Sequence, residues 1–181
     1  MGRIEVIIGP MYSGKSSELI RLIRRYKTIG KNILTINHKS DNRYGNDIIC
    51  THDAERIACL SLDKLSDSHK EKIYPDLDII IIEEAQFFSD LYEFVVTSAN
   101  RDNKTIIVAG LDGDYKQQLF GDILRLIPHA EKVVKLHALC KECGDGTPAS
   151  FTKRITSDKE QTLVGGTQHY RAVCRYHMNN D

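Results

Sequence analysis

The residues Gly9-Pro10-Met11-Tyr12-Ser13-Gly14-Lys15-Ser16 set the architecture that we expect for this chain of 181 residues. They fit the pattern G-x-x-x-x-G-K-[ST] of a phosphate-binding loop. Residues 4–8, just before the loop, are apolar and β-branched, which is typical of a buried strand. Residues 17–26, just after it, place their apolar side chains on one helical face. The motif requires this order of strand, loop and helix, although a chance match in an ordinary strand-to-helix turn is the alternative.

The loop also predicts how the phosphates of a nucleotide would be held. Its backbone N–H groups form a concave nest for anions, and the helix that follows adds its partial positive charge. Gly9 and Gly14 supply the backbone freedom that a close approach to a phosphate needs. Lys15 is expected to reach the β- and γ-phosphates, and the Ser16 hydroxyl to bind Mg²⁺.

A second informative segment, residues 77–84, ends in two carboxylates. Its four consecutive isoleucines suit a strand that is buried on both faces of a parallel sheet. Glu83 and Glu84 follow at the carboxyl end, where open α/β sheets bind ligands. Neighbouring strand residues point to opposite sides, so one carboxylate is expected to face the metal and the other the reacting hydroxyl. The alternative is that both are solvated charges at a strand end.

Strands alternate with helices along most of the chain. We expect strands at 32–37, 57–60, 77–82, 105–109 and 132–136, and helices at 63–72, 90–101 and 120–127, the last stopped by Pro128. Asp90 and Glu93 resemble a capping pair at the start of their helix. The alternation predicts an α/β fold over residues 1–137, with a phosphate-loop NTPase-type parallel sheet and flanking helices.

The last part of the chain, residues 138–181, has a different character and is expected to form a small zinc-ribbon subdomain. Cys140, Cys143, Cys174 and His177 make a C-x-x-C … C-x-x-H set, which matches tetrahedral Zn²⁺. Four protein ligands leave no open position, so the predicted zinc is structural. A redox C-x-x-C pair, or thiols with a chance histidine, are the alternatives. Cys50 and Cys59 lack a partner motif.

Composition excludes several classes of protein. The formal net charge is zero, so no overall field favours nucleic acid or a membrane surface as a partner. No apolar run reaches the roughly 18 residues of a membrane span, and no signal peptide is visible at the start. We therefore expect a cytoplasmic protein. The polar segment 39–47 is either a plain surface loop or a mobile loop of the site.

Several motifs occur together and in order: the phosphate loop, Glu83-Glu84-Ala85-Gln86-Phe87-Phe88, Leu111-Asp112-Gly113 with Phe120-Gly121, the C-x-x-C pair, and Val164-Gly165-Gly166 with Tyr170. In this combination the chain resembles thymidine kinases of the cytosolic, zinc-containing type over nearly its whole length. The resemblance implies an ATP-dependent deoxynucleoside kinase that makes thymidine monophosphate for nucleotide salvage and DNA synthesis. The γ-phosphoryl of ATP would pass to the 5′-hydroxyl of thymidine, with Mg²⁺ as the metal of the co-substrate.

The resemblance also assigns roles to residues. Glu84 matches the catalytic base, which takes the proton of the 5′-hydroxyl. The implied ATP- and phosphate-binding residues are Gly9, Pro10, Met11, Tyr12, Ser13, Gly14, Lys15, Ser16, Asp41, Asn42, Arg43, Glu83, Ala85 and Gln86. A C-terminal lasso loop is expected to hold the base, and the implied substrate-binding residues are Met11, Phe87, Leu111, Tyr115, Phe120, Gln161, Thr162, Leu163, Val164, Gly165 and Tyr170.

The resemblance further implies a homotetramer, feedback inhibition by thymidine triphosphate, and some acceptance of deoxyuridine. The chain departs from the family pattern at Tyr12, Glu83, Ala85, Tyr115 and His177, where Phe, Asp, Gly, Phe and Cys are more usual. The long tail of some animal members is not expected. Two other functions remain open: a nucleic-acid-dependent ATPase with a zinc ribbon, and a sensor that binds nucleotide without turnover.

Overall fold

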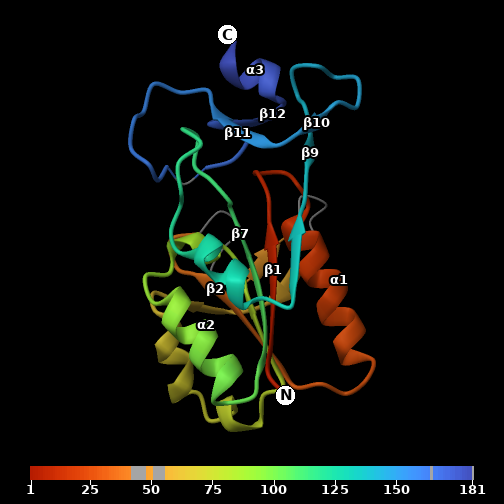
Figure 1. Cartoon of the computed structure of the whole chain (residues 1–181), viewed down its shortest axis with the longest axis vertical. Coiled ribbons are helices and arrows are strands. Elements are labelled where there is room, and N and C mark those ends of the chain that lie inside the picture. The colour runs from red at the N-terminus through yellow and green to blue at the C-terminus, as the bar shows by residue number, and fades with distance from the viewer. Residues whose placement is uncertain (42–47, 51–55, 164, 181) are drawn as a thin grey trace.

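The computed structural model, which describes residues 1–41, 48–50, 56–163 and 165–180, is built around a parallel sheet. This sheet has six strands, and all of its neighbouring pairs are parallel (Figure 1). From edge to edge the strands are β5 (Leu60–Leu62), β2 (Ile33–His38), β6 (Ile79–Ile82), β7 (Thr105–Gly110), β1 (Arg3–Ile8) and β8 (Lys132–Lys135). A separate hairpin pairs β3 (Ile48–Cys50) with β4 (Arg56–Ala58). The predicted α/β fold with a parallel sheet is confirmed.

Helices cover both faces of this sheet, as its isoleucine-rich central strand predicted. Ile79 and Ile81 of β6 pack with the apolar side of α1 (Lys15–Lys27) in one cluster. Ile80 and Ile82, which point the other way, pack in a second cluster with α2 (Leu91–Asn100). All four isoleucines are buried, so a strand without polar alternation is stable only in this sandwiched position. No helix in the described ranges is both long enough and apolar enough to span a membrane.

Two of the predicted helices are 3₁₀ rather than α-helical. Residues 63–72 contain η1 (Leu65–Lys70), followed by η2 (Tyr74–Asp76), and residues 120–127 correspond to η4 (Ile123–His129). The prediction that Pro128 ends the latter was wrong, because η4 continues through it to His129. The capping prediction for Asp90 was also wrong. Its backbone is not extended, and its carboxylate instead accepts the N–H groups of Leu65 and Ser66 at the start of η1.

The described part of residues 138–181, which we call the C-terminal subdomain, lies beyond the carboxyl ends of the sheet strands, at the end of the molecule opposite the N-terminus (Figure 1). It contains two hairpins, β9 (Ala138–Leu139) with β10 (Pro148–Ala149) and β11 (Phe151–Arg154) with β12 (Tyr170–Val173), and then α3 (Arg175–Asn179). Its apolar core is small, and Tyr12 of the phosphate loop packs against it. The division into residues 1–137 and 138–181 stays a prediction.

We expect Ile81→Ala to destabilise the fold by about 2–5 kcal/mol, because its side chain is fully buried in the sheet and its loss leaves a cavity. Urea unfolding monitored by circular dichroism measures this change. Ile29→Ala is the matched control, since Ile29 is 66% exposed, and it should change stability by no more than about 0.5 kcal/mol. Equal effects of the two substitutions would contradict the assigned core.

Candidate functional site

The loop between β1 and α1 is shaped by unusual backbone angles. Gly9 and Gly14 have φ values of +152° and +83°, and Tyr12 between them has φ +66°. A Cβ atom on Gly9 would lie 2.5 Å from the carbonyl oxygen of Leu136, so only glycine fits there. No side chain from the described residues caps the N-terminus of α1. The first N–H groups of a helix have no acceptor within the helix, so this N-terminus suits an anion.

Lys15, the first residue of α1, stabilises this loop with its own charge. Its Nζ donates hydrogen bonds to the carbonyl oxygens of Gly9 at 3.2 Å and Pro10 at 2.8 Å, and the residue is buried. A buried ammonium is costly unless its donors are satisfied, and here two loop carbonyls satisfy them. The cation therefore lies inside the curve of the loop, where phosphate oxygens would compete for it.

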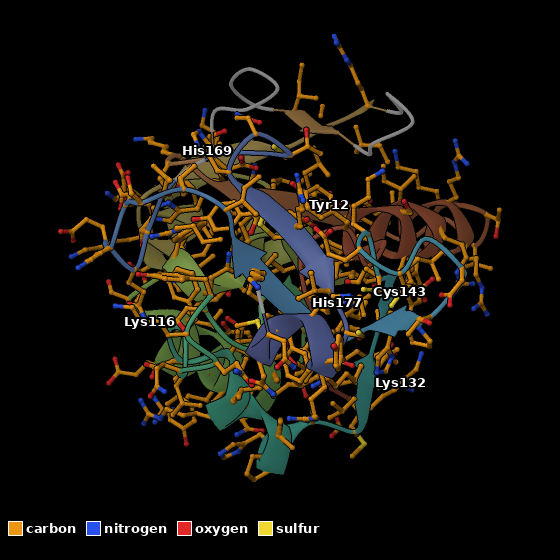
Figure 2. All side chains as sticks on the ribbon, turned by 90° about the horizontal axis from the view of Figure 1, so that it is seen from above. Tyr12, Lys116, Lys132, Cys143, His169 and His177 are labelled. Atoms are coloured by element: carbon orange, nitrogen blue, oxygen red, sulfur yellow. The ribbon has the colours of Figure 1, made fainter. Side chains whose placement is uncertain are left out.

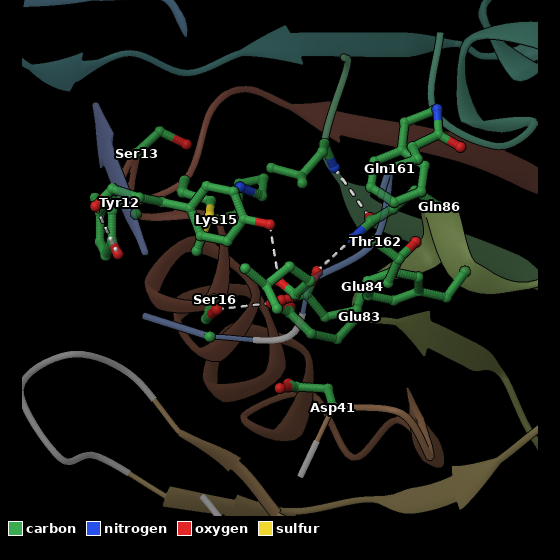
Figure 3. A pocket seen from close by; sticks show the side chains of 18 of the residues that line it. Tyr12, Ser13, Lys15, Ser16, Asp41, Glu83, Glu84, Gln86, Gln161 and Thr162 are labelled. Carbon is green, nitrogen blue, oxygen red and sulfur yellow. Dashed lines mark hydrogen bonds between the residues drawn. The ribbon is translucent and has the colours of Figure 1, made fainter. Parts of the chain in front are cut away.

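The two carboxylates after β6 make different contacts, as the strand geometry predicted (Figure 3). Glu83 is buried, and its Oε1 accepts the Ser16 hydroxyl at 2.6 Å. Glu84 is partly exposed, and its Oε2 accepts the side-chain amide of Gln86 at 2.6 Å. The other end of that amide accepts the backbone N–H of Leu111 at 3.0 Å. Glu83 is thus hydrogen-bonded to the last residue of the phosphate-loop motif. The side-chain amide of Gln86 links Glu84 to the backbone just after β7.

The backbone of Glu84 is itself in the left-handed region, with φ 50° and ψ 41°. Such conformations cost of order 1–3 kcal/mol in a non-glycine residue and are concentrated at functional sites. The turn directs the chain from the buried strand into η3 (Ala85–Phe87) and separates the two carboxylates. Close packing holds it in place: a Cβ on Gly110 would lie 2.5 Å from Gln86 Oε1, and a Cβ on Gly121 2.3 Å from the Gln86 carbonyl oxygen.

A cavity of about 900 Å³, measured with its open mouth, joins these groups to the C-terminal subdomain. Its lining residues include the phosphate loop from Met11 to Ser16, both carboxylates, the side chains of Phe87 and Phe120, and part of residues 161–165. Phe87 and Phe120 meet edge to face, with ring centroids 5.4 Å apart. One wall of the cavity is thus polar and rich in N–H groups, and another is aromatic.

The C-terminal subdomain is bonded directly to the phosphate loop. The backbone N–H of Met11 donates to Thr152 Oγ1 on β11 at 3.0 Å, and the Tyr12 hydroxyl donates to the carbonyl oxygen of Tyr170 on β12 at 3.4 Å. The β11–β12 hairpin therefore holds the phosphate loop at its base. Its two strands also flank residues 155–169 in the sequence, and the predicted base-binding residues 161–165 belong to that segment.

The four predicted metal ligands converge at the far end of the subdomain. Their ligand atoms all lie within 4.8 Å of one another, and Figure 2 shows Cys143 and His177 together. His177 Nδ1 lies 3.6, 3.5 and 3.4 Å from the sulfur atoms of Cys140, Cys143 and Cys174, and the Cys143 and Cys174 sulfurs are 3.8 Å apart. A zinc tetrahedron with Zn–S of about 2.3 Å and Zn–N of about 2.0–2.1 Å has edges of roughly this length.

The thiols of the cluster differ in pKa: burial raises the pKa of Cys143 to about 11, whereas that of Cys140 is lowered. Burial by itself raises the pKa of the Cys140 thiol, but N–H groups of Cys174 and Cys143 outweigh it and bring that pKa to about 6. The thiolate is the form that binds zinc. Hydrogen bonding to the Cys174 and Cys140 sulfurs raises the pKa of His177. The donor set fits a structural Zn²⁺ better than an isolated redox pair, because all four atoms converge.

Comparison with known proteins identifies the family. A sequence model described as thymidine kinase matches residues 2–178. The chain belongs to the thymidine kinase family. This membership confirms the family that the motifs predicted and, with it, the predicted class of enzyme.

Relatives from plants, viruses and animals share this similarity. The chain is 44% identical over 181 residues to a thymidine kinase of Oryza sativa subsp. japonica, covering 97% of this chain and 66% of that protein. It is 45% identical over 174 residues to the thymidine kinase of Sheeppox virus (strain KS-1), covering 96% and 95%. It is 44% identical over 174 residues to the protein named cytosolic thymidine kinase in Homo sapiens, covering 96% and 72%.

The structure of this thymidine kinase family member brings most of the predicted site residues to the cavity. Those that line it are Met11, Tyr12, Ser13, Gly14, Lys15, Ser16, Asp41, Glu83, Glu84, Gln86, Phe87, Leu111, Phe120, Gln161, Thr162, Leu163, Gly165 and Tyr170. Gly9, Pro10, Ala85 and Tyr115 are not among its described lining residues. Asn42, Arg43 and Val164 lie outside the described residues, so their roles stay predictions.

Several residues that shape the site were not predicted from the sequence. Ser17 lines the cavity, Thr152 bonds the phosphate loop, and Asp114 accepts the side-chain amide of Gln161 at 2.9 Å. Arg154 donates hydrogen bonds to backbone carbonyl oxygens of the segment after β11. Ser17 could have been found as the neighbour of the loop motif. Thr152 and Asp114 act over long sequence separations and left no local signal, whereas Arg154 bonds carbonyls only four to seven residues further along the chain.

We expect purified protein to contain about one zinc per chain, because four matched ligands converge. Cys174→Ala should lower the zinc content well below one per chain and reduce thermal stability, as measured by elemental analysis and calorimetry. Cys59→Ala is the control, since Cys59 lies outside the cluster. A folded wild-type protein that holds no zinc would contradict the assignment.

Proposed function

We propose that this chain transfers the γ-phosphoryl group of ATP to the 5′-hydroxyl of thymidine and so makes thymidine monophosphate. The observation that carries the proposal is a cavity whose lining includes the phosphate loop, Glu84, residues 161–163 and Gly165. Family membership supports the reaction class, and the adjoining walls of this cavity support a site for each substrate. Phosphoryl transfer mainly needs positioning and charge neutralisation, which such a cavity offers.

At the phosphate end, the loop N–H groups and Lys15 are proposed to hold the ATP phosphates. Lys15 would exchange its bonds to the Gly9 and Pro10 carbonyls for phosphate oxygens, so little rearrangement is needed. Ser13 supports this role, because its buried Oγ has no hydrogen-bond partner among the described residues. Asp41 also lines the cavity, and Asn42 and Arg43 are proposed to act beside it.

Mg²⁺ would enter with ATP and neutralise the charge on its phosphates. Ser16 Oγ and Glu83 Oε1 are hard oxygen donors only 2.6 Å apart, which fits Mg²⁺ chemistry, with each oxygen binding directly or through water. The longer side chain of Glu83, in place of the usual Asp, reaches the Ser16 hydroxyl from the end of β6. The substitution is therefore compatible with the proposed metal role.

Glu84 is proposed to be the general base that accepts the proton of the 5′-hydroxyl. Its carboxylate lines the cavity, and the Gln86 amide orients one of its oxygens. A base needs to lie within about 2.6–3.2 Å of the proton donor, and we propose that the left-handed turn at Glu84 directs the carboxylate to the boundary of the two substrate regions. Deprotonation makes the oxygen a better nucleophile for the incoming phosphoryl group.

At the nucleoside end, backbone groups of residues 161–165 are proposed to read the edge of the base, and Tyr170 to support them. Met11, Phe87, Leu111 and Phe120 line the adjoining wall, where a flat ring would lie. A pocket for the thymine methyl group adds only about 1–3 kcal/mol, so we propose that deoxyuridine is accepted more weakly. Tyr115 is proposed to act on the base indirectly.

The family resemblance supports three further proposals. These are a homotetramer, feedback inhibition by thymidine triphosphate, and a cytoplasmic location, the last in line with the name of the human relative. Light scattering and inhibitor titration test the first two. Cell fractionation tests the third.

We expect Glu84→Gln to lower kcat by about 10²–10⁴-fold while ATP still binds, because the amide cannot accept the proton. Steady-state kinetics and ATP titration measure the two effects. Glu93→Gln on α2 is the control, since that side chain is exposed and away from the cavity, and its kcat should match wild type. Near-normal turnover by Glu84→Gln would remove Glu84 from the base role.

An assay with labelled ATP and the four common deoxynucleosides, plus deoxyuridine, tests the function itself. We expect thymidine to be phosphorylated best, deoxyuridine within about 10–200-fold in kcat/KM, and the others far less. The assay contains no nucleic acid, so a DNA-dependent ATPase would show no transfer. A sensor without turnover would bind thymidine and form no monophosphate, and either result would refute the proposal.

A further inference from the structure

Arg154, the last residue of β11, is a buried cation that the proposed chemistry does not use. Its side chain is 2% exposed, although it precedes a segment of exposed residues. Burying a guanidinium is costly unless nearly all of its donors are satisfied. What satisfies them therefore indicates what the residue does.

The Nη1 and Nη2 donors are satisfied mainly by backbone carbonyls of one short segment, whereas the buried Nε has no hydrogen-bond partner among the described residues. Nη1 donates to the carbonyl oxygens of Asp158, at 3.2 Å, and of Glu160, and Nη2 donates to that of Gln161 at 3.2 Å. A single carboxylate oxygen, Asp158 Oδ1, lies 3.5 Å away. Carbonyl oxygens belong to the main chain, so these bonds fix the path of residues 158–161 whatever side chains they carry.

Two tyrosines extend this hold along the segment. The Arg154 guanidinium lies 3.8 Å from the ring centre of Tyr115 and 5.1 Å from that of Tyr170. Nη2 also donates to the Tyr170 hydroxyl at 2.5 Å, and that hydroxyl donates to the Leu163 carbonyl oxygen at 2.8 Å. The Tyr115 hydroxyl donates to the Lys159 carbonyl oxygen at 2.8 Å. A planar fork that both stacks and donates is specific to arginine.

Two of the carbonyl groups that accept these hydrogen bonds belong to residues that line the cavity, and the others belong to residues just before them. Gln161, Thr162 and Leu163 are lining residues, and the first and third of them have carbonyls held by Arg154 or by Tyr170. The side chain of Gln161 is fixed separately, by Asp114. Within the part of the chain that the structure describes, Arg154 bonds this segment and the two tyrosines, so its loss should loosen the segment and leave the sheet intact.

We propose that Arg154 is a positioning residue that holds residues 158–163 in the conformation that binds the nucleoside base, and so sets the affinity for thymidine without touching the reacting atoms. The inference rests on the proposed function of that segment. If the binding conformation is only fractionally populated, the apparent affinity falls by that fraction. Arg154 raises the population through bonds that exist before substrate arrives.

The test compares Arg154→Met and Arg154→Lys with Arg171→Met. Methionine keeps the length and apolar packing of arginine, and lysine keeps the charge but loses the planar fork. Arg171 is the matched control: it lies on the paired strand β12, but its side chain is about half exposed and bonds Glu142. Zinc content and melting temperature are measured for each protein.

For Arg154→Met we expect the KM for thymidine to rise by about 10-fold or more, as when the competent state falls to about one tenth. The KM for ATP and kcat should stay within about twofold of wild type, with zinc retained. Arg154→Lys should resemble Arg154→Met, because charge alone cannot replace stacking and three carbonyl bonds. Arg171→Met should behave as wild type.

Trypsin gives a readout that does not depend on kinase activity. Lys159 is an exposed trypsin site inside the segment, and the Arg154 variants should be cut there faster than wild type and Arg171→Met. An unchanged thymidine KM, or a parallel fall of both substrate affinities, kcat and zinc content, would overturn the proposal. If wild type phosphorylated no thymidine, the proposed function would fail, and the rate of cleavage after Lys159 would still decide whether Arg154 holds the segment.

Discussion

Parallel pairing of three central strands is the constraint on which the site depends. In register, Ile8 of β1 lies opposite Gly110 of β7, and Ile82 of β6 lies opposite Val108 of β7. The carboxyl ends of β1, β6 and β7 therefore lie side by side, and the phosphate loop, the two glutamates and Leu111 must meet there. The hydrogen bond from Ser16 to Glu83 and the amide bridge of Gln86 are consequences of this register.

The second requirement is a segment that covers the carboxyl ends of these strands, and the C-terminal subdomain supplies it. Its apolar core is too small to be expected to fold alone, and a zinc ion bound by the four clustered ligands would compensate for this. Thr152 and Tyr170 connect the β11–β12 hairpin to the phosphate loop, while Arg154 on the same hairpin holds the segment assigned to the nucleoside. One hairpin thus contacts both proposed substrate regions, so zinc binding, loop geometry and nucleoside affinity are physically connected.

Much of this was predictable from the sequence, and the rest was not, for a physical reason. The phosphate loop, the isoleucine strand and the cysteine pairs are local patterns, in which neighbours in sequence make the structure. Strand alternation predicted that Glu83 and Glu84 would have different partners, but in the structure the left-handed turn at Glu84 separates them. Asp90 has the residue type of a helix cap, yet it bonds Leu65 and Ser66, 25 and 24 positions earlier. Arg154 and Asp114 likewise depend on contacts with segments that only the folded chain brings near.

The most direct measurement is a crystal structure with Mg²⁺, a non-hydrolysable ATP analogue and thymidine. The account predicts that the analogue's phosphates lie on residues 9–16 and that the Glu84 carboxylate lies within about 2.6–3.2 Å of the thymidine 5′-oxygen, directly or through one water. It also predicts that backbone groups of residues 161–165 face the base. A thymidine bound away from this cavity, or a 5′-oxygen turned away from Glu84, would contradict it.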